Sequence, residues 1–316
     1  MADSQYILEV NNLCQHFSSG RGKKKLTVKA VDDVTFGVRP AETFGLVGES
    51  GCGKTTTGRT IIRLYDPTGG EVLFNGRDIA GKMNPDLRKY LTDNIAMIFQ
   101  DPNASLDPRM TVRDIIAEGL YIQGIKDKEY IEEKVYEMLE TVGLVREHAS
   151  RYPHEFSGGQ RQRIGVARAL VMEPSLIIAD EPISALDVSI RAQIINLLND
   201  LRNNLGITIL FIAHDLSVVK YFSDRIGVMY FGKMIELADS DELFAHPMHP
   251  YTRSLLSAIP LPDPHSEKNR TRIVYNSLLE HDYSVDKPTL REIKPGHFVR
   301  CNDAEELKYK KELGLI

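Results

Sequence analysis

The sequence predicts an α/β fold, a mixed sheet flanked by helices, and three observations lead to this prediction. Mostly apolar runs of strand length occur at residues 43–47, 95–99, 176–179 and 207–213, which is typical of buried strands in a parallel sheet. A glycine-rich turn joins the first run to a helical pattern at 55–64. A long stretch of helical periodicity, without a strand pattern, separates the second run from the third. The 316 residues suffice for one large or two modest domains with a substantial core.

Shorter β segments precede and follow the glycine-rich turn. Residues 6–10 and 28–38 alternate apolar and polar side chains as half-buried strands do, with a glycine- and lysine-rich loop at 18–25 between them. Residues 70–76 predict a short hairpin strand closed by an Asn-Gly turn. Together they predict an antiparallel β subdomain. Phe17 ends its first strand, where an aromatic ring can stack on a purine base; the alternative is an ordinary core or rim phenylalanine.

The glycine-rich turn fits the pattern G-x-x-x-x-G-K-[ST] at every fixed position. It consists of Gly48, Glu49, Ser50, Gly51, Cys52, Gly53, Lys54 and Thr55. Glycines let the backbone bend so that successive N–H groups point at phosphate oxygens, and the start of the next helix adds partial positive charge. In this pattern Lys54 contacts the β- and γ-phosphates and the Thr55 hydroxyl binds Mg²⁺. The alternative is a plain glycine turn with an incidental lysine.

Polar side chains directly follow three of the predicted strands. Gln100 ends one strand, Asp180 and Glu181 end the next, and His214 ends a third. Because open α/β sheets bind ligands at the carboxyl ends of their strands, we expect these side chains on the same edge as Lys54. There Asp180 is suited to hold Mg²⁺, and Glu181 to take a proton from an attacking water. Each also has an ordinary structural alternative when it is considered alone. Gln100 would be a surface or capping residue, Asp180 and Glu181 would form a solvated turn, and His214 would be a structural histidine.

The long helical stretch covers residues 111–147 and predicts a helical subdomain inserted into the α/β core. It leads to the run Ser157, Gly158, Gly159 and Gln160, which opens another helix with an apolar face. The serine is placed as an N-cap, and the two glycines leave backbone N–H groups unscreened, so the segment can hold an anion. A plain helix start is the alternative.

Composition excludes several classes of protein. A net charge of −5 argues against an electrostatic nucleic-acid binder, which needs a basic face. Cys14, Cys52 and Cys301 are far apart and form no C-x-x-C pair, which indicates a reducing compartment rather than a disulfide framework or zinc site. The first residues show no secretory signal, and no apolar run approaches eighteen residues. We therefore expect a cytosolic or peripherally bound protein.

From about residue 246 the chain is richer in proline and histidine, notably at 246–251 and 259–264. Such residues break helix and strand alike. We therefore expect the C-terminal part to be an extension wrapped on the core and partly ordered.

Taken together, the elements resemble the ATP-binding subunit of an ABC transporter over about residues 6–255. The motifs that carry the resemblance occur in that family's order and approximate spacing. They are the phosphate loop, Gln100, the run from Ser157 to Gln160, Asp180 with Glu181, the run Ser184, Ala185, Leu186 and Asp187, and His214. The resemblance implies a P-loop NTPase core in an ATPase domain at 6–250, with the helical subdomain at about 101–165 and an extension at 251–316.

What the resemblance implies further is a pair of such domains, facing head to tail and clamping two ATP molecules. One domain supplies the phosphate loop with Lys54, Phe17 beneath the adenine, Gln100 sensing Mg²⁺ and water, Glu181 as base and His214 on the γ-phosphate. The other supplies the run from Ser157 to Gln160. The implied ATP-binding residues are Phe17, Gly48, Glu49, Ser50, Gly51, Cys52, Gly53, Lys54, Thr55, Thr56, Gln100, Ser157, Gly158, Gly159, Gln160, Asp180, Asp187 and His214, with Thr55, Gln100 and Asp180 on Mg²⁺.

The C-terminal extension indicates a particular subfamily. Residues 249–256 and 259–264 look like the extension of oligopeptide and dipeptide importer ATPases, and 294–299 resemble the F-type ATPase subunit of oligopeptide permeases. The implied partners are a second, different ATPase subunit, two membrane permease subunits and, indirectly, an extracellular peptide-binding protein, with this chain on the cytoplasmic face of the membrane. Some relatives carry a cysteine cluster for an iron–sulfur centre, but this tail has only Cys301, so we expect no such cluster.

The competing interpretation is a soluble ABC-type ATPase that acts on nucleic acid or ribosomes. Such proteins generally hold two ATPase units in one chain, or a long coiled coil between the phosphate loop and the Ser157 run. This chain has one ATPase unit, a short helical insert and a negative net charge, and all three features favour the importer.

Overall fold

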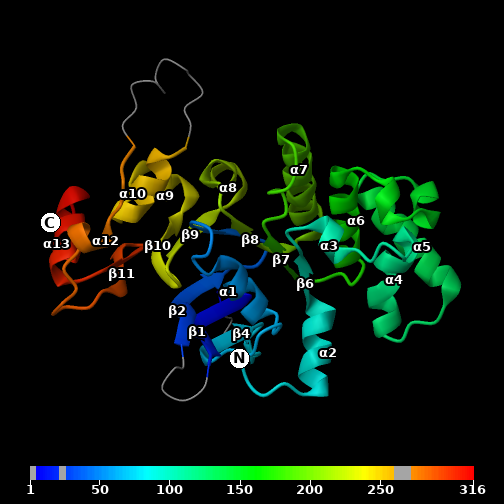
Figure 1. The fold of residues 1–316 in the computed structure, drawn as a ribbon, viewed down its shortest axis with the longest axis horizontal. Coiled ribbons are helices and arrows are strands. Elements are labelled where there is room, and N and C mark those ends of the chain that lie inside the picture. Colours follow the sequence, from blue (N-terminus) through cyan, green and yellow to red (C-terminus); the bar gives the residue numbers. More distant parts are fainter. Residues whose placement is uncertain (1–4, 21–25, 260–271) are drawn as a thin grey trace.

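The computed structural model describes residues 5–20, 26–259 and 272–316. The chain is arranged around one large sheet, with the helical insert at one end and the C-terminal extension at the other (Figure 1). Part of the predicted loop at 18–25 and most of the proline-rich segment at 259–264 lie outside the described residues.

The large sheet is mixed, as the sequence predicts. In the described residues its eight strands run in the order β11-β12-β10-β9-β3-β8-β7-β6, and the pairs from β9 to the edge strand β6, namely β9-β3, β3-β8, β8-β7 and β7-β6, are parallel. The strands are β3 (Thr43–Val47), β6 (Ile95–Ile98), β7 (Leu176–Asp180), β8 (Thr208–Ala213), β9 (Arg225–Tyr230), β10 (Lys233–Asp239), β11 (Thr289–Lys294) and β12 (His297–Cys301). The chain between β6 and β7, which holds the helical insert, contains no strand, in agreement with the sequence pattern.

A second sheet forms the predicted antiparallel β subdomain. It has the order β2-β1-β4-β5, from β1 (Leu8–Ser19), β2 (Leu26–Val38), β4 (Gly69–Phe74) and β5 (Arg77–Asp78). Asn75 and Gly76 both have positive φ, 49° and 73°, as the predicted two-residue hairpin turn requires.

Alternate residues of the central strands enter two cores, one on each face of the large sheet. Ile177 and Ala179 of β7 pack into the core shared with the helical insert. Leu176 and Ile178 pack into the core shared with the β subdomain. Successive side chains of a strand point to opposite faces, so a fully apolar strand is what this position demands.

Helices cover both faces of the sheet and build the insert (Figure 1). They are α1 (Lys54–Ile61), α2 (Pro85–Asn94), α3 (Pro102–Ser105), α4 (Val112–Ile122), α5 (Lys128–Thr141), α6 (Gly158–Leu170), α7 (Val188–Leu205), α8 (Leu216–Phe222), α9 (Ser240–Ala245), α10 (Pro250–Ser257), α12 (Ser277–Glu280) and α13 (Asp303–Glu312), with short 3-10 turns at Arg146–Ser150 and Pro153–Glu155. The apolar residues of α4 and α5 that predicted the insert, among them Ile115, Ile116, Val135 and Leu139, are buried in its core.

The C-terminal extension is more regular than the sequence predicts. Pro250 does not break a helix but opens α10, because the first helical turn needs no N–H from proline. Strand β12 pairs with β10 and so extends the large sheet, with Glu236 opposite Val299. The expectation that proline and histidine break regular structure here was therefore wrong for residues 250–251, whereas residues 246–249 do separate α9 from α10.

Close packing of α8 on the sheet gives a test of this arrangement. A Cβ on Gly45 of β3 would lie 2.5 Å from Cγ1 of Val219 and 2.7 Å from Oγ of Ser223. Gly45→Ala should therefore destabilise the fold by about 1–3 kcal/mol through overpacking, as measured by urea unfolding. Gly165→Ala in α6, where a Cβ meets nothing within 4 Å, is the matched control and should be neutral or stabilising. Equal stability of the two variants would contradict the packing described.

Candidate ATP-binding and hydrolysis site

A cavity of about 380 Å³ opens at the carboxyl ends of the parallel strands. The strand register explains its position, because Val47 pairs with Ala213, Asp180 with Ile212 and Ile98 with Ala179, so the strands end nearly level. The lining residues are Ala30, Ser50, Gly51, Gly53, Lys54, Thr55, Thr56, Gln100, Glu181 and His214. The prediction that Gln100, Glu181 and His214 share an edge with Lys54 is confirmed.

The phosphate loop depends on glycine at two close backbone approaches. Gly48 has φ +149°, and a Cβ there would lie 2.2 Å from the carbonyl oxygen of Met229. Gly53 has φ +110°, and a Cβ there would lie 2.2 Å from the carbonyl oxygen of Ala30. Any side chain would push the loop away from its neighbouring strands. The fixed glycines of the motif therefore hold the loop against the sheet edge.

Lys54 is folded onto its own loop. Its ammonium, on a side chain only 3% exposed, donates to the carbonyl oxygens of Gly48 at 2.7 Å and Glu49 at 3.0 Å and lies 3.8 Å from Sγ of Cys52. Burial raises the pKa of the Cys52 thiol, so this third contact is with a weak, neutral acceptor. A phosphate oxygen can replace the thiol contact while both carbonyl bonds remain.

Asp180 and Thr55 form a buried pair suited to a cation. The hydroxyl of Thr55 donates to Oδ1 of Asp180 at 2.7 Å. Among the described residues, Oδ2 of Asp180 has no hydrogen-bond partner, and its nearest cation is Nη2 of Arg59 at 3.7 Å. Burial raises the pKa of Asp180, and the bond from Thr55 offsets this only in part. An unpartnered buried carboxylate oxygen beside a hydroxyl is the oxygen donor set that Mg²⁺ prefers.

Two side chains converge on the carboxylate of Glu181. Nε2 of Gln100 donates to its Oε2 at 3.1 Å, and Nδ1 of His214 lies 3.1 Å from the same oxygen. Glu181 itself has φ +45°, an uncommon conformation for a residue with a side chain, and its backbone N–H donates to the carbonyl oxygen of Ile212. This backbone turn carries the carboxylate from the end of β7 into the cavity.

The other sequence-predicted residues lie outside the lining of this cavity. Ser157 caps α6 as predicted: its hydroxyl accepts the N–H of Gln160 at 3.3 Å, while its own N–H donates to Oε1 of Gln160 at 3.0 Å. Gly158 and Gly159 follow in the first turn, and a Cβ on Gly159 would lie 2.5 Å from Ile190. Asp187 is the exposed N-cap residue of α7 and makes no side-chain capping bond. These residues do not complete the site of their own chain.

Phe17 also lies outside the cavity lining. It is 40% exposed, and its ring packs edge-on against Tyr65 at 5.2 Å. The role of Phe17 beneath adenine stays a prediction.

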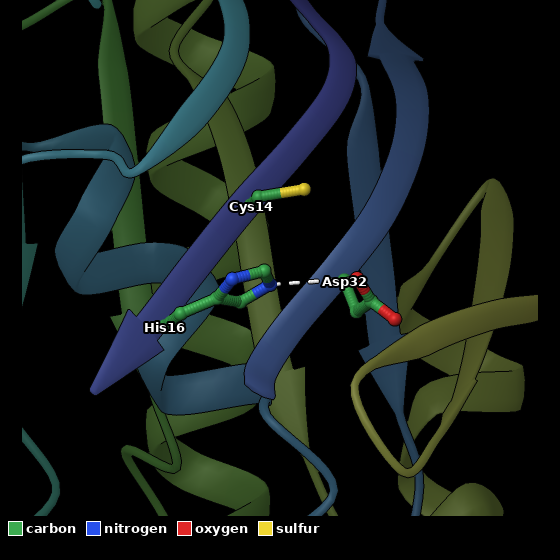
Figure 2. A group of neighbouring side chains, drawn as sticks. All are labelled: Cys14, His16 and Asp32. Carbon is green, nitrogen blue, oxygen red and sulfur yellow. Dashed lines mark ion pairs between the residues drawn. The ribbon is translucent and has the colours of Figure 1, made fainter. Parts of the chain in front are cut away.

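Beside Phe17, strands β1 and β2 bring together Cys14, His16 and Asp32 (Figure 2), whose potential ligand atoms lie within 4.8 Å of one another. Asp32 already binds two ammonium groups, at 3.0 Å from Lys233 and 3.4 Å from Lys29. Burial acts to raise the pKa of Asp32, but these ammonium groups outweigh it and hold the pKa below its usual range. We therefore assign the cluster to ion pairing.

Three contacts of the site are not evident from the sequence. Arg59, one turn into α1, faces the buried Asp180, and the carbonyl oxygen of Ala30 lies so close to Gly53 that it leaves no room for a side chain there. A third contact, from Tyr251 to the N–H of Glu49, comes from the C-terminal extension. Of these three contacts, only the one from Tyr251 involves a segment that the sequence analysis singled out. That analysis identified the segment as part of the extension and did not predict which residues Tyr251 contacts.

Solved structures define the class of protein. A dimeric post-hydrolysis state of the ATP-binding cassette MJ0796, bound to ADP and Pi, matches with a TM-score of 0.66 and 28% identity over 74% of this chain and 98% of that one. The cbiO1 protein of Clostridium perfringens, part of the ABC transporter complex cbiONQ, matches with a TM-score of 0.67 and 28% identity over 77% and 92%. The fold and the site thus define an ATP-binding cassette.

Sequence comparisons identify the family. Residues 31–184 match the ABC transporter family, and residues 235–284 match the oligopeptide/dipeptide transporter C-terminal region. The oligopeptide transport ATP-binding protein OppF of Bacillus subtilis is 60% identical over 96% of this chain and 98% of its own length. The dipeptide transport ATP-binding protein DppF of Lactococcus lactis is 53% identical over the whole of both chains. The chain belongs to this family of ABC transporter ATP-binding proteins.

No helix in the part of the chain that the structure describes is both long and apolar enough to span a membrane.

The position of Lys54 gives a test of the phosphate site. Lys54→Ala removes a cation that holds the loop and faces the cavity, so ATP affinity should fall about tenfold or more, as measured by isothermal titration calorimetry. Lys134→Ala on α5 removes the same charge from an ion pair with Glu137 and Glu173 and should leave affinity unchanged. Unaltered ATP binding by the Lys54 variant would place the phosphates elsewhere.

Proposed function

We propose that this chain hydrolyses ATP to power the import of oligopeptides or dipeptides through membrane permease subunits. Two findings support the substrate class: the names of its full-length relatives and the match to the oligopeptide/dipeptide transporter C-terminal region. The observation that carries the hydrolytic activity is the convergence of Gln100 and His214 on Glu181 above the phosphate loop. The nucleic-acid alternative gains no support from the relatives.

Glu181 is the proposed general base. Its carboxylate is 13% exposed and borders the cavity, where it can accept a proton from a water aligned with the γ-phosphate. Gln100 and His214 hold one of its oxygens and leave the other for that water. When ATP enters, His214 is also placed to donate to the γ-phosphate, because it lines the same cavity as Lys54.

The proposed Mg²⁺ ligands or ligand supports are Thr55, Asp180 and Gln100. Thr55 and Asp180 fit such a role through their buried oxygen pair, and Gln100 lines the same cavity. Bound Mg²⁺ would neutralise charge on the β- and γ-phosphates. The chain's own part is to hold the two oxygen donors in a fixed position at the start of α1 and the end of β7.

A complete site requires a second ATPase subunit. Ser157, Gly158, Gly159 and Gln160 lie outside their own chain's cavity, and the solved cassette MJ0796 is dimeric. We therefore place this run against the nucleotide of a facing, homologous subunit, with Asp187 near the same interface. The remaining proposed partners are two permease subunits and an extracellular peptide-binding protein, which place this chain on the cytoplasmic face of the membrane.

The base assignment predicts a separation of binding from turnover. Glu181→Gln keeps the size of the side chain but removes its basicity, so hydrolysis should fall by about 100-fold or more while ATP affinity stays near wild type. The rate of hydrolysis is measured as phosphate release by the assembled transporter, and the ATP affinity is measured by nucleotide titration. Turnover within about tenfold of wild type would exclude Glu181 as the base.

The shared site predicts that a variant in one subunit impairs the nucleotide of the other. Ser157→Ala in this chain, assembled with a wild-type partner, should reduce hydrolysis at the partner's phosphate loop, as resolved by trapping nucleotide at each site separately.

Thr111→Ala is the matched control for that experiment, since Thr111 also caps a helix of the insert, accepting the N–H of Asp114. Both variants should lose about 1 kcal/mol of stability. The same loss of hydrolysis in both would attribute the effect of Ser157 to capping alone.

A further inference from the structure

The C-terminal extension touches the phosphate loop through one side chain. Tyr251, in the first turn of α10, is 2% exposed, and its hydroxyl accepts the backbone N–H of Glu49 at 3.1 Å. The two residues are 202 positions apart in the chain. The contact therefore exists only when the extension is packed on the ATPase core.

Glu49 is held on both sides of its backbone. Its N–H is bound by Tyr251, and its carbonyl oxygen accepts from the ammonium of Lys54 at 3.0 Å. Lys54 also binds the carbonyl oxygen of Gly48. Lys54, which faces the proposed phosphate site, is thus hydrogen-bonded to the peptide groups next to Tyr251. A shift of this segment would therefore move the carbonyl oxygens that hold the lysine ammonium.

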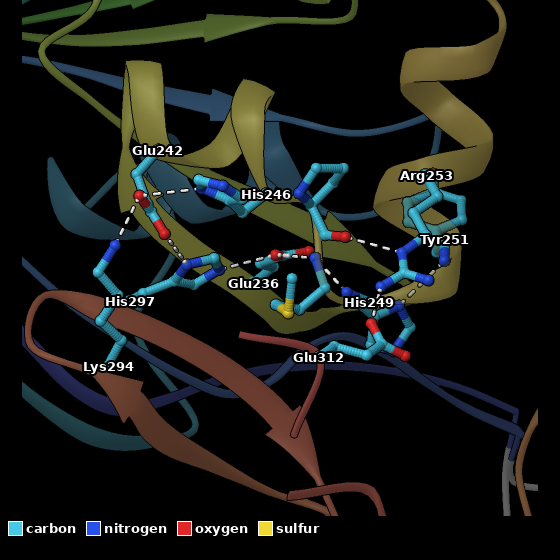
Figure 3. Close-up of polar contacts among 11 residues, drawn as sticks. Glu236, Glu242, His246, His249, Tyr251, Arg253, Lys294, His297 and Glu312 are labelled. Carbon is cyan, nitrogen blue, oxygen red and sulfur yellow. Dashed lines mark hydrogen bonds and ion pairs between the residues drawn. The ribbon is translucent and has the colours of Figure 1, made fainter. Parts of the chain in front are cut away.

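Buried polar contacts hold Tyr251 in turn. Its N–H donates to Nδ1 of His249 at 3.1 Å, and the N–H of His249 donates to Glu236 at 3.0 Å. Figure 3 shows Glu236 between this turn and His297, whose Nε2 lies 2.9 Å away. Glu236 and His297 are both fully buried, on the neighbouring strands β10 and β12. The extension's own strand therefore supports the turn that presents Tyr251.

Aromatic packing fixes the ring itself. Tyr230 and Tyr275 lie against it, with ring centroids at 4.4 Å and 5.5 Å. Tyr230 ends β9, which runs parallel to β3, the strand that leads into the phosphate loop. With the ring enclosed by these neighbours, the position of the hydroxyl is set by the extension and the sheet together rather than by a free rotamer.

We propose that Tyr251 is a positioning residue for ATP binding, through which the C-terminal extension sets the geometry of the phosphate loop. It touches no nucleotide atom itself. Its hydroxyl holds the Glu49 peptide in the orientation that lets Lys54 bond the loop and face the phosphates at once. This inference rests on the proposed nucleotide site and adds to it a residue from outside the motifs.

Tyr251→Phe tests the inference because it removes only the hydroxyl. Loss of one neutral hydrogen bond to the loop should weaken binding of ATP and ADP by about three- to tenfold, as measured by calorimetry on the full chain with Mg²⁺. In the assembled transporter the variant should raise KM for ATP by a similar factor with kcat within about twofold. Amide hydrogen exchange at Glu49 should become faster.

Tyr275→Phe is the matched control. It removes the same group from a ring that packs on Tyr251, and among the described residues its hydroxyl makes no hydrogen bond to the phosphate loop. This variant should bind nucleotide as wild type does, and both should melt within about 2 °C of wild type.

Several outcomes would overturn the inference. They are unchanged nucleotide affinity in Tyr251→Phe, an equal loss in Tyr275→Phe, or a fall in melting temperature that accounts for the weaker binding. Failure of the wild-type chain to bind ATP would instead refute the proposed function, so the two failures are distinguishable.

Discussion

The level ending of parallel strands at one sheet edge is the constraint on which this site depends. Backbone pairing sets Val47 beside Ala213 and Asp180 beside Ile212, so the residues that follow must meet. Together they bring a loop of N–H groups, a buried carboxylate, the proposed base and a histidine to this edge. No side-chain contact has to assemble the site, because the hydrogen bonds of the ladder already do so. This explains why Gln100, Glu181 and His214, which come from distant segments, need only lie one or two positions beyond their strands to line one cavity.

The residues at this edge enclose the site on one side only. The cavity is lined by strand ends and the phosphate loop, whereas the capped helix with Ser157 belongs to the insert and presents its N-terminus elsewhere. An anion held between two such surfaces brings two chains together, and removal of its terminal phosphate weakens that link. In the proposed function, two chains share each nucleotide, and its hydrolysis would therefore let the two chains separate. The extension also contacts the phosphate loop, since the hydroxyl of Tyr251 accepts the N–H of Glu49 and the turn that holds Tyr251 is bonded through Glu236 to His297 of β12.

Much of this was predictable from the sequence, for identifiable reasons. The apolar runs before Gln100, Glu181 and His214 predict buried parallel strands. Because parallel strands end at the same edge of a sheet, the residues that follow them are predicted to meet at that edge. The extension was not predictable in the same way. The local pattern predicts that Pro250 breaks regular structure, but Pro250 opens a helix, and the pairing of β12 with β10 depends on tertiary contacts that no local pattern encodes. The bond from Tyr251 to Glu49 spans 202 positions, so periodicity carries no information about it.

A structure of the paired ATPase subunits with a slowly hydrolysed ATP analogue tests the account most directly. We expect the γ-phosphate next to Lys54 and His214 of this chain, with the capped helix of the facing subunit closing over it. A nucleotide enclosed by one chain alone, or phosphates bound away from Lys54, would contradict it.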